Sequence, residues 1–137
     1  MLFAGRTAVV TGAGSGIGRA LAVGFCRDGA AVVGIGRTHA DLAQTAELCV
    51  PGRMHFVVGD VAREEDVSRL VARATGSKGQ IDFLLNNAAL YPKQRFLEAS
   101  AAAWAAAIQV NLIGMATCCR MVLPGMLERG YGRILNL

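Results

Sequence analysis

Short apolar runs alternate with amphipathic segments along this chain, and this alternation limits the possible fold more than any other feature. The apolar runs lie at 6–12, 30–36, 53–60, 81–89 and 132–137, and segments with helical spacing lie between them, at 16–29, 38–50, 63–76 and 100–126. Strands that alternate with helices form a parallel sheet covered by helices on both faces. The 137 residues are enough for one domain. We therefore predict a single α/β domain over residues 1–137, with a doubly wound parallel sheet.

Several local signals predict how the helices begin, end and face the core. Gly29 is expected to end the first helix, and Thr38 with Asp41 fits a capping box at the start of the second. Pro124 is expected to kink or end the last helix. The first helix is expected to bury the face that carries Ile17, Ala20, Leu21, Gly24 and Phe25. The last helix is expected to bury Trp104, Ile108, Leu112, Met115 and Cys119.

Composition and charge exclude several classes of protein. The chain is 53% hydrophobic and only 18% charged, which argues against disorder. We find neither a secretory leader nor an apolar run of about 20 residues, so we expect a cytoplasmic protein without a membrane span. The formal net charge is +4, but the arginines are scattered and no basic run is interleaved with aromatic residues. Nucleic-acid binding is therefore not expected, whereas a mildly positive surface suits a phosphorylated small molecule.

The four cysteines do not indicate a metal site or disulfides. Cys26, Cys49, Cys118 and Cys119 form no C-x-x-C pair, and neither histidine lies at metal-ligand spacing beside them. Each lies in an apolar, helix-like context. We expect buried free thiols and no bound metal.

Four glycines crowd the junction between the first strand and the first helix. The stretch TGAGSGIG fits T-G-x-x-x-G-x-G through Thr11, Gly12, Gly16 and Gly18, and it does not fit G-x-G-x-x-G, because Ile17 stands where the last glycine is required. Glycines let a backbone approach an anion closely, and a helix N-terminus favours negative charge. The motif by itself indicates either a pyrophosphate-binding loop or a glycine-rich structural turn.

Three further motifs follow in order on successive elements: GDV at 59–61, NNAA at 86–89 and VNLIG at 110–114. Together with the glycine stretch they resemble the short-chain dehydrogenase/reductase family, and the resemblance covers the whole chain. It implies a Rossmann-type fold, truncated here in the fifth strand. It also implies an oxidoreductase that interconverts an alcohol and a carbonyl with a nicotinamide dinucleotide.

The resemblance assigns cofactor contacts residue by residue. It places Gly12, Ser15, Gly16, Ile17 and Gly18 at the pyrophosphate. It places Asp60 and Val61 at the adenine, although an acid there also suits the start of a helix. Asn87 and Ala88 match a motif beside the cofactor ribose, in which Ala89 replaces the family's glycine.

Asn111 matches a family residue that supports a water-linked proton relay. We expect a buried Asn111, which needs hydrogen-bond partners among apolar neighbours; it also suits a residue that braces a helix irregularity through the backbone.

The end of the second strand bears on cofactor choice. NAD-selective sites carry an acid there, whereas this chain has Gly36 and Arg37. The Arg37 guanidinium can hold a 2′-phosphate through several donors, which favours NADP over NAD; the alternative is a solvated loop charge. Tyr91, Lys93 and Arg95 follow the fourth strand, where contact with substrate competes with ordinary loop solvation.

The family's chemistry also requires a serine and a Tyr-x-x-x-Lys pair. This chain has Tyr91 and Tyr131, its lysines are Lys78 and Lys93, and no Tyr-x-x-x-Lys occurs. We therefore expect the amino-terminal, cofactor-binding part of a longer enzyme, a homo-oligomer when complete, and no turnover from this part alone. The alternatives are a non-catalytic dinucleotide-binding or regulatory module and a decayed fragment that binds nothing.

Overall fold

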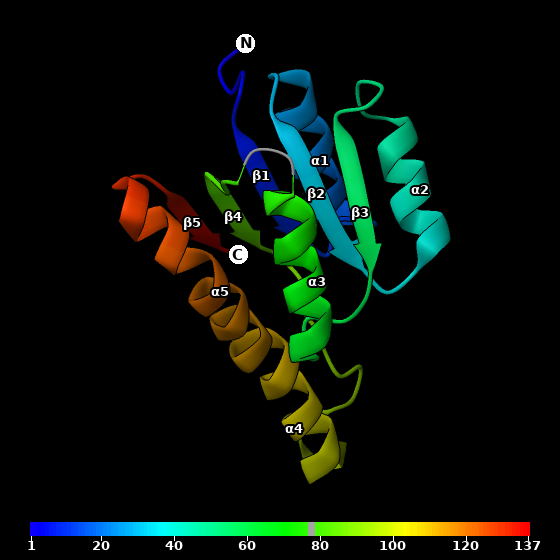
Figure 1. The fold of residues 1–137 in the computed structure, drawn as a ribbon. Helices are drawn as coiled ribbons and strands as arrows, with labels where there is room; N and C mark the ends of the chain where they lie inside the picture. The colour runs from blue at the N-terminus through cyan, green and yellow to red at the C-terminus, as the bar shows by residue number, and fades with distance from the viewer. Residues whose placement is uncertain (77–78) are drawn as a thin grey trace.

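The computed structural model describes residues 1–76 and 79–137, so Lys78 lies outside the described residues. Five parallel strands form one sheet in the order β3-β2-β1-β4-β5 (Figure 1). The strands are β1 (Thr7–Thr11), β2 (Ala31–Gly36), β3 (Met54–Val58), β4 (Phe83–Asn86) and β5 (Arg133–Asn136). The helices are α1 (Gly16–Arg27), α2 (His39–Glu47), α3 (Glu64–Thr75), η1 (Phe96–Glu98), α4 (Ala101–Ile108), η2 (Gln109–Gly114) and α5 (Met115–Arg129). The predicted α/β fold is confirmed.

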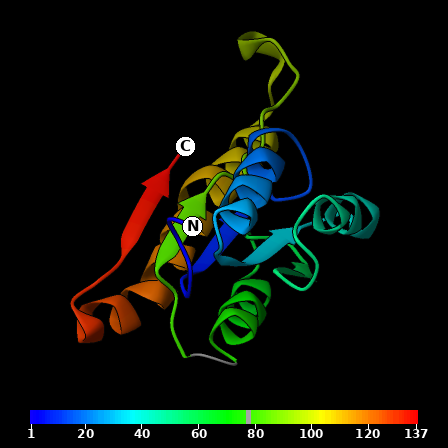
Figure 2. The ribbon, with the colours of Figure 1, turned by 90° about the horizontal axis from the view of Figure 1, so that it is seen from above.

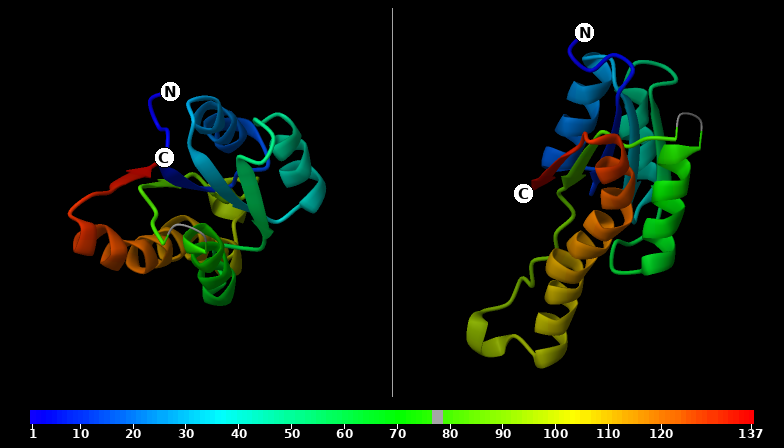
Figure 3. Two further views of the ribbon diagram at one scale, coloured as in Figure 1. Left: turned by 45° about the horizontal axis from the view of Figure 1, so that its top comes forward. Right: turned by 60° about the vertical axis from the view of Figure 1, so that its left-hand side comes forward.

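Helices cover both faces of the sheet because the strands are apolar on both faces. In β1, Val9 belongs to the core beneath α3 and α5, whereas its neighbours Ala8 and Val10 belong to the core beneath α1 and α2. Figure 3 shows the two helical layers on opposite sides of the strands. Each core residue therefore contributes to one of two separate hydrophobic layers, as a doubly wound sheet requires.

The topology places a ligand site at the carboxyl end of β1. The chain passes from β1 to β2 on one side, and β4 later pairs with β1 on the other. In open α/β sheets, such a point of reversal leaves a crevice between the loops that leave the strands. β5 lies at one edge, beside β4 (Figure 2).

The last helical stretch buries a different face from the one that its sequence predicts. Trp104, Ile108 and Leu112 are 44%, 51% and 53% exposed, whereas Cys118 and Val122 are buried against the sheet. At Gly114 the helical stretch lies against the segment that follows β3: a Cβ there would lie 2.8 Å from the Val61 carbonyl oxygen. In addition, η2 is a π-helical turn, which shifts the register of every residue after it.

Two other local predictions are wrong, and of the two outcomes predicted for Pro124 the end of the helix does not occur. Thr38 begins α2, but its side chain makes no capping hydrogen bond, because Asp41 and the Thr38 side chain both line the cleft described below. Ile17 is 65% exposed, since α1 turns Gly18, Ala22 and Cys26 inward instead. Pro124 lies inside α5 without ending it. It is exposed, so water can hydrate the carbonyl that loses its helical partner.

The other helix-ending signals agree with the structure. Gly29 has φ 98° directly after α1, and Gly130 has φ 65° directly after α5. These left-handed conformations favour glycine and end both helices.

The stretch Ala101–Arg129 is also long and apolar enough to cross a membrane, by length and composition alone. It contains no uninterrupted apolar run of about 20 residues, because Gln109, Asn111 and Arg120 interrupt it. Only 22% of its most apolar window is buried. Its inner residues Cys118, Val122 and Met126 nevertheless belong to the core beneath the sheet, as expected for a helix of a globular domain.

Candidate functional site: a cleft at the carboxyl end of the sheet

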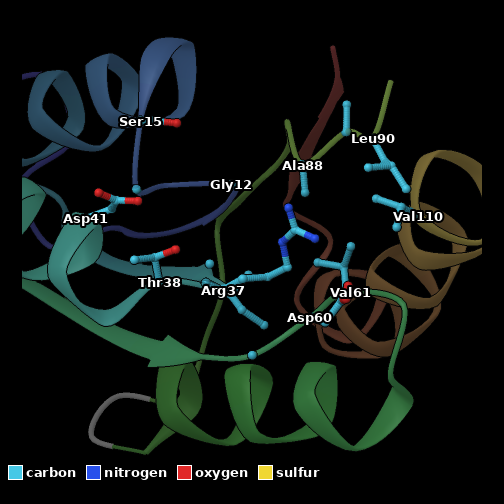
Figure 4. A pocket seen from close by; sticks show the side chains of 15 residues that line it. Gly12, Ser15, Arg37, Thr38, Asp41, Asp60, Val61, Ala88, Leu90 and Val110 are labelled. Carbon is cyan, nitrogen blue, oxygen red and sulfur yellow. The ribbon is translucent and has the colours of Figure 1, made fainter. Parts of the chain in front are cut away.

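A cleft of about 220 Å³ opens where β1, β2 and β4 end (Figure 4). Its walls come from the end of β2, from the loops that follow β1, β2, β3 and β4, and from the helices α2 and η2. The glycine-rich loop contributes Gly12, Gly14 and Ser15, and the segment after β2 contributes Arg37, Thr38 and Asp41. The remaining walls contain Ile35, Gly36, Gly59, Asp60, Val61, Ala88, Ala89, Leu90 and Val110.

Two glycines of the motif, Gly12 and Gly18, allow segments of the chain to approach each other closely, and Gly12 also lines the cleft. Gly12 has φ 66°, and a Cβ there would lie 2.8 Å from Asn87 Nδ2. A Cβ at Gly18 would lie 2.1 Å from the Gly12 carbonyl oxygen. Gly18 therefore lets α1 begin directly against the loop. Of the residues predicted to touch a pyrophosphate, Gly12 and Ser15 line the cleft, whereas Gly16, Ile17 and Gly18 do not contribute to its walls.

Thr11 and Asn87 fix the loop to the end of β4. The Thr11 hydroxyl accepts hydrogen bonds from the backbone N–H groups of Asn87 and Ala88, each at 2.9 Å. In return, Asn87 Nδ2 donates to the carbonyl oxygens of Thr11 and Gly12, at 3.1 and 3.3 Å. Asn87 thus positions the loop, while Ala88 lines the cleft. The sequence resemblance placed both beside a ribose and gave no sign of this brace.

The start of α1 presents hydrogen-bond donors to the cleft. Ser15 precedes the helix in an extended conformation, and its side chain does not cap it. The first backbone N–H groups of a helix have no partner within the helix, and the helix dipole adds partial positive charge there. This end of the cleft is therefore suited to an anion.

Arg37 brings a second positive charge. It is exposed, and no hydrogen-bond or ion-pair partner for its guanidinium occurs among the described residues. Figure 4 shows its side chain extending into the cavity. Thr38 and Asp41, which sequence reasoning treated only as a helix cap, lie on the same wall. The wall therefore combines an unpaired cation, a hydroxyl and a carboxylate.

Asp66 holds in place the turn that contains Asp60 and Val61, the residues predicted to bind the adenine. Asp60 accepts from the N–H of Ala62 at 2.9 Å, and its own N–H donates to Asp66 Oδ2 at 2.8 Å. Arg69 pairs with the same Asp66 carboxylate at 2.7 Å. The Arg69 guanidinium, together with the Asp60 N–H, holds the pKa of Asp66 below its usual range. Asp66 therefore stays ionised and fixes the turn, and Asp60 and Val61 both reach the cleft.

Asn111 is exposed and not buried, which corrects the sequence prediction. Its Oδ1 accepts from the Leu90 N–H at 2.7 Å, and its Nδ2 donates to the Leu90 carbonyl at 3.0 Å. It lies in the π-helical turn η2, where such turns frequently mark functional sites. The pair of bonds fastens the segment after β4. Ala89 in that segment has no left-handed backbone, so the replacement of the family's glycine introduces no strain.

A smaller cavity of about 80 Å³ adjoins the cleft. It shares Val61, Ala88, Ala89 and Val110 with the cleft and adds Tyr91 and Asn111. Asn86, 5% exposed, also lines it. Its Nδ2 donates to Asn136 Oδ1 at 2.8 Å, while its Oδ1 has no partner in the described part of the chain. Lys93 and Arg95 line neither cavity.

The cysteines lie in hydrophobic surroundings. Cys26, Cys49 and Cys118 are free and buried, and Cys119 is partly buried. Burial raises the pKa of Cys26 and of Cys118 to about 12, so both stay protonated at neutral pH. Within residues 1–76 and 79–137, no group of three or more His, Cys, Asp or Glu side chains lies together as a metal-ligand set.

Comparison with known proteins gives consistent matches. A family model described as short chain dehydrogenase matches residues 6–137. An uncharacterized oxidoreductase of Staphylococcus saprophyticus is 37% identical over 96% of this chain and 58% of its own length. Human L-xylulose reductase is 38% identical over 100% of this chain and 54% of its own length. The chain therefore spans little more than half of these curated relatives.

A solved structure agrees with the sequence matches. A short-chain dehydrogenase/reductase from Brucella melitensis superimposes with a TM-score of 0.84 at 37% identity, over 90% of this chain and 51% of that one. The match supports both the parallel sheet and the order of its strands.

Proposed function

Because the chain belongs to the short-chain dehydrogenase family, we propose that it is the cofactor-binding part of an NADP(H)-preferring oxidoreductase that interconverts an alcohol and a carbonyl. When bound, the nicotinamide dinucleotide supplies or accepts the hydride. The residues of this chain bind and orient it. The N-terminus of α1, with Gly12 and Ser15, receives the pyrophosphate. Asp60 and Val61 border the adenine, and Ala88 borders the ribose.

The unpaired Arg37 in the cleft is the observation that carries the NADP preference. A 2′-phosphate has two negative charges at most and accepts hydrogen bonds on several oxygens, so a guanidinium matches it well. The Asp41 carboxylate on the same wall opposes this charge, and a ribose hydroxyl would suit it. The Arg37 guanidinium has the charge that binds a phosphate, whereas the Asp41 carboxylate would repel it. No acid follows β2 directly.

Replacing Arg37 by methionine tests the preference. Affinities of the chain for NADPH and NADH are measured by titration of the nucleotide fluorescence. We expect the variant to weaken NADPH binding by about tenfold or more, as for a lost charge-assisted hydrogen bond, and NADH binding by less than threefold. Arg95→Met is the matched control, since it removes an exposed arginine outside both cavities and should change neither. Equal losses for the two nucleotides would contradict the preference.

We expect binding without turnover from these 137 residues, since they contain no Tyr-x-x-x-Lys pair. NADPH should raise the melting temperature of the chain, because a ligand that binds only the folded state stabilises it. A decayed fragment would show no shift. A serine followed by Tyr-x-x-x-Lys in the complete natural protein supports the enzyme, and their absence there supports a dinucleotide-binding or regulatory module.

We further propose a cytoplasmic homo-oligomer for the complete protein, with a small alcohol or carbonyl as substrate. The exposed apolar residues along α4, η2 and α5 support association, since such patches mark contact surfaces. Light scattering on the complete protein tests this proposal, and a monomer at micromolar concentration would contradict it.

A further inference from the structure

Arg19 connects two walls of the cleft without lining it. Its Nη2 donates to the Gly14 carbonyl oxygen in the glycine loop, and also to the Asp41 carbonyl oxygen in α2 at 3.5 Å. Its Nε donates to Thr45 Oγ1, farther along α2, at 3.1 Å. One partly buried guanidinium is thus shared by the pyrophosphate loop and the helix that follows Arg37.

Thr45 completes the connection from the other side. It is fully buried, and its hydroxyl lies 3.0 Å from the carbonyl oxygens of both Ala13 and Asp41, so it donates to one of them at a time. The loop and the helix approach so closely here that a Cβ at Gly14 would lie 3.0 Å from Asp41 Cβ. A methyl group at Gly14 would therefore require Asp41 to shift slightly.

We propose that Arg19 is a positioning residue for cofactor choice, which sets the start of α2, and with it Arg37, against the glycine loop. Arg37 directly precedes Thr38, the residue that begins α2, and the first turn of α2 is held by the bonds to the Asp41 carbonyl. The distance between the pyrophosphate position and the Arg37 guanidinium therefore depends on Arg19. This inference rests on the proposed binding of NADP(H) in the cleft.

The two walls predict an unequal effect on the two nucleotides. NADH and NADPH share the pyrophosphate, so loosening the glycine loop affects both. Only NADPH carries the 2′-phosphate, so misplacing Arg37 affects it alone. Loss of Arg19 should therefore weaken both nucleotides slightly and NADPH much more. A residue that merely stabilised the fold would weaken both by the same factor.

A double-mutant cycle tests the inference. Dissociation constants for NADPH and NADH are measured for the unmodified chain, Arg19→Met, Arg37→Met and the double variant, with 2′,5′-ADP as a probe without nicotinamide. We expect Arg19→Met to weaken NADPH and 2′,5′-ADP by about tenfold and NADH by less than threefold. In the Arg37→Met background, the same change should leave the NADPH-to-NADH ratio unaltered, because Arg19 acts through Arg37.

Two further variants keep the test decisive. Arg27→Met removes an arginine of the same helix outside the cleft and should change no dissociation constant. Arg19→Lys keeps a donor for the Gly14 and Asp41 carbonyls, so it should fold and recover part of the NADPH selectivity even if Arg19→Met unfolds. If Arg19→Lys folds and binds NADPH and NADH with equally reduced affinity, the inference is wrong.

The outcomes separate this inference from the proposed function. If Arg37→Met loses NADPH selectively and Arg19→Met does not, the proposed function stands and the role of Arg19 is overturned. If Arg19→Met lowers the ratio equally in both backgrounds, Arg19 acts independently of Arg37, and the inference again fails. If Arg37→Met shows no selective loss, or the chain binds neither nucleotide, both proposals fail together.

Discussion

The floor of the cleft and the outer face of the last helical stretch are built in opposite ways. Around the cleft, short side chains and backbone groups satisfy one another: Thr11, Asn87 and Asp66 each bond a backbone group in another segment. Along α4, η2 and α5, large apolar side chains such as Trp104, Ile108 and Leu112 lie on the surface instead. This stretch extends beyond the sheet (Figure 3, right).

Polar contacts around the cleft and apolar periodicity along the last helical stretch give different information about which surfaces meet. Gly18, which lies against the Gly12 carbonyl, and Thr11, which bonds two backbone N–H groups, both have their partners within this chain. A helical stripe of apolar residues indicates only that some surface is buried. It does not say whether the sheet or another surface covers it. In this structure, Cys118, Val122 and Met126 face the sheet, whereas Trp104, Ile108 and Leu112 face outward.

The largest expected effect comes from closing the space behind the cleft with a methyl group. Gly18→Ala places a Cβ within 2.1 Å of the Gly12 carbonyl oxygen, and backbone cannot give way cheaply. We expect a loss of about 3 kcal/mol or more in the free energy of unfolding, measured with urea. Gly24→Ala in the same helix meets nothing within 4 Å and should stabilise the chain by about 0.5–1 kcal/mol. Similar changes in the free energy of unfolding for Gly18→Ala and Gly24→Ala would show that the contact of Gly18 with the loop is not tight.

Removing one hydroxyl should cost nearly as much. Thr11→Val leaves the N–H groups of Asn87 and Ala88 without their acceptor, at about 1–3 kcal/mol for each group that water cannot reach. We expect about 2–3 kcal/mol in chemical denaturation, together with weaker nucleotide binding. Thr11→Ser keeps the oxygen and should lose less than half as much. A Thr11→Val protein of unchanged stability would show that water replaces the hydroxyl.

Val122 and Leu112 allow the inner and outer faces of the last helical stretch to be compared directly. Val122→Ala removes buried methyl groups beneath the sheet and should lower the free energy of unfolding by about 2 kcal/mol. Leu112→Ala removes a larger side chain that is 53% exposed, and should change the same quantity by about 0.5 kcal/mol or less. Thermal denaturation of both proteins measures the difference. The reverse order would mean that the outer face is covered in solution.

The smallest expected effect depends on pH. The pKa of Asp66 is lowered in the folded chain by Arg69 and the Asp60 N–H, so its ionisation stabilises the fold above the unfolded pKa of about 3.9. That contribution disappears as the pH falls through the lower, folded value. Asp66→Asn should therefore cost about 1 kcal/mol at neutral pH, and the gap to the unmodified chain should close below about pH 4. Melting curves from pH 7 to pH 3 measure the gap.

A neighbouring acid provides the control for that experiment. Glu65 lies one residue earlier in α3 and is 78% exposed, and its contact with Arg63 is 3.7 Å long. Glu65→Gln should stay within about 0.5 kcal/mol of the unmodified chain at every pH. A pH-dependent gap of the same size at Glu65 would assign the effect to net charge rather than to the Asp66 brace.

The order of strands and helices was predictable from the sequence because the central strands β1, β2 and β4 are apolar on both faces and because glycine or polar residues bound the strands. The cleft was predictable in outline for the same reason, since Gly12, Ser15, Arg37, Asp60, Val61 and Ala88 follow four different strands. Asp41 and Thr38 were missed as lining residues because a helix cap explained them fully. Arg19 and Asp66 were missed because each also bonds backbone groups, which no residue type in the sequence indicates.

The errors on the last helical stretch have different physical origins. Trp104 and Ile108 precede η2, so a change of register in η2 does not explain their exposure. A 3.6-residue period predicts a face only while the helix stays regular, and η2 changes the register in the middle. Asn111 lies in this irregular turn, where it bonds the backbone of Leu90 at the surface rather than in the core. Pro124 is tolerated farther along because it faces outward.

The position of the chain's one tryptophan decides which optical signal can follow binding. Trp104 lies on α4, 44% exposed, with its ring 5.5 Å from that of Phe96, and it lines neither cavity. Emission excited at the red edge of indole absorption therefore reports on the surroundings of Trp104 at the end of the helical stretch. A reduced nucleotide in the cleft absorbs where indole emits, so it also lowers this emission by energy transfer. The oxidised nucleotide does not absorb there, so with it the indole signal follows the helical stretch alone.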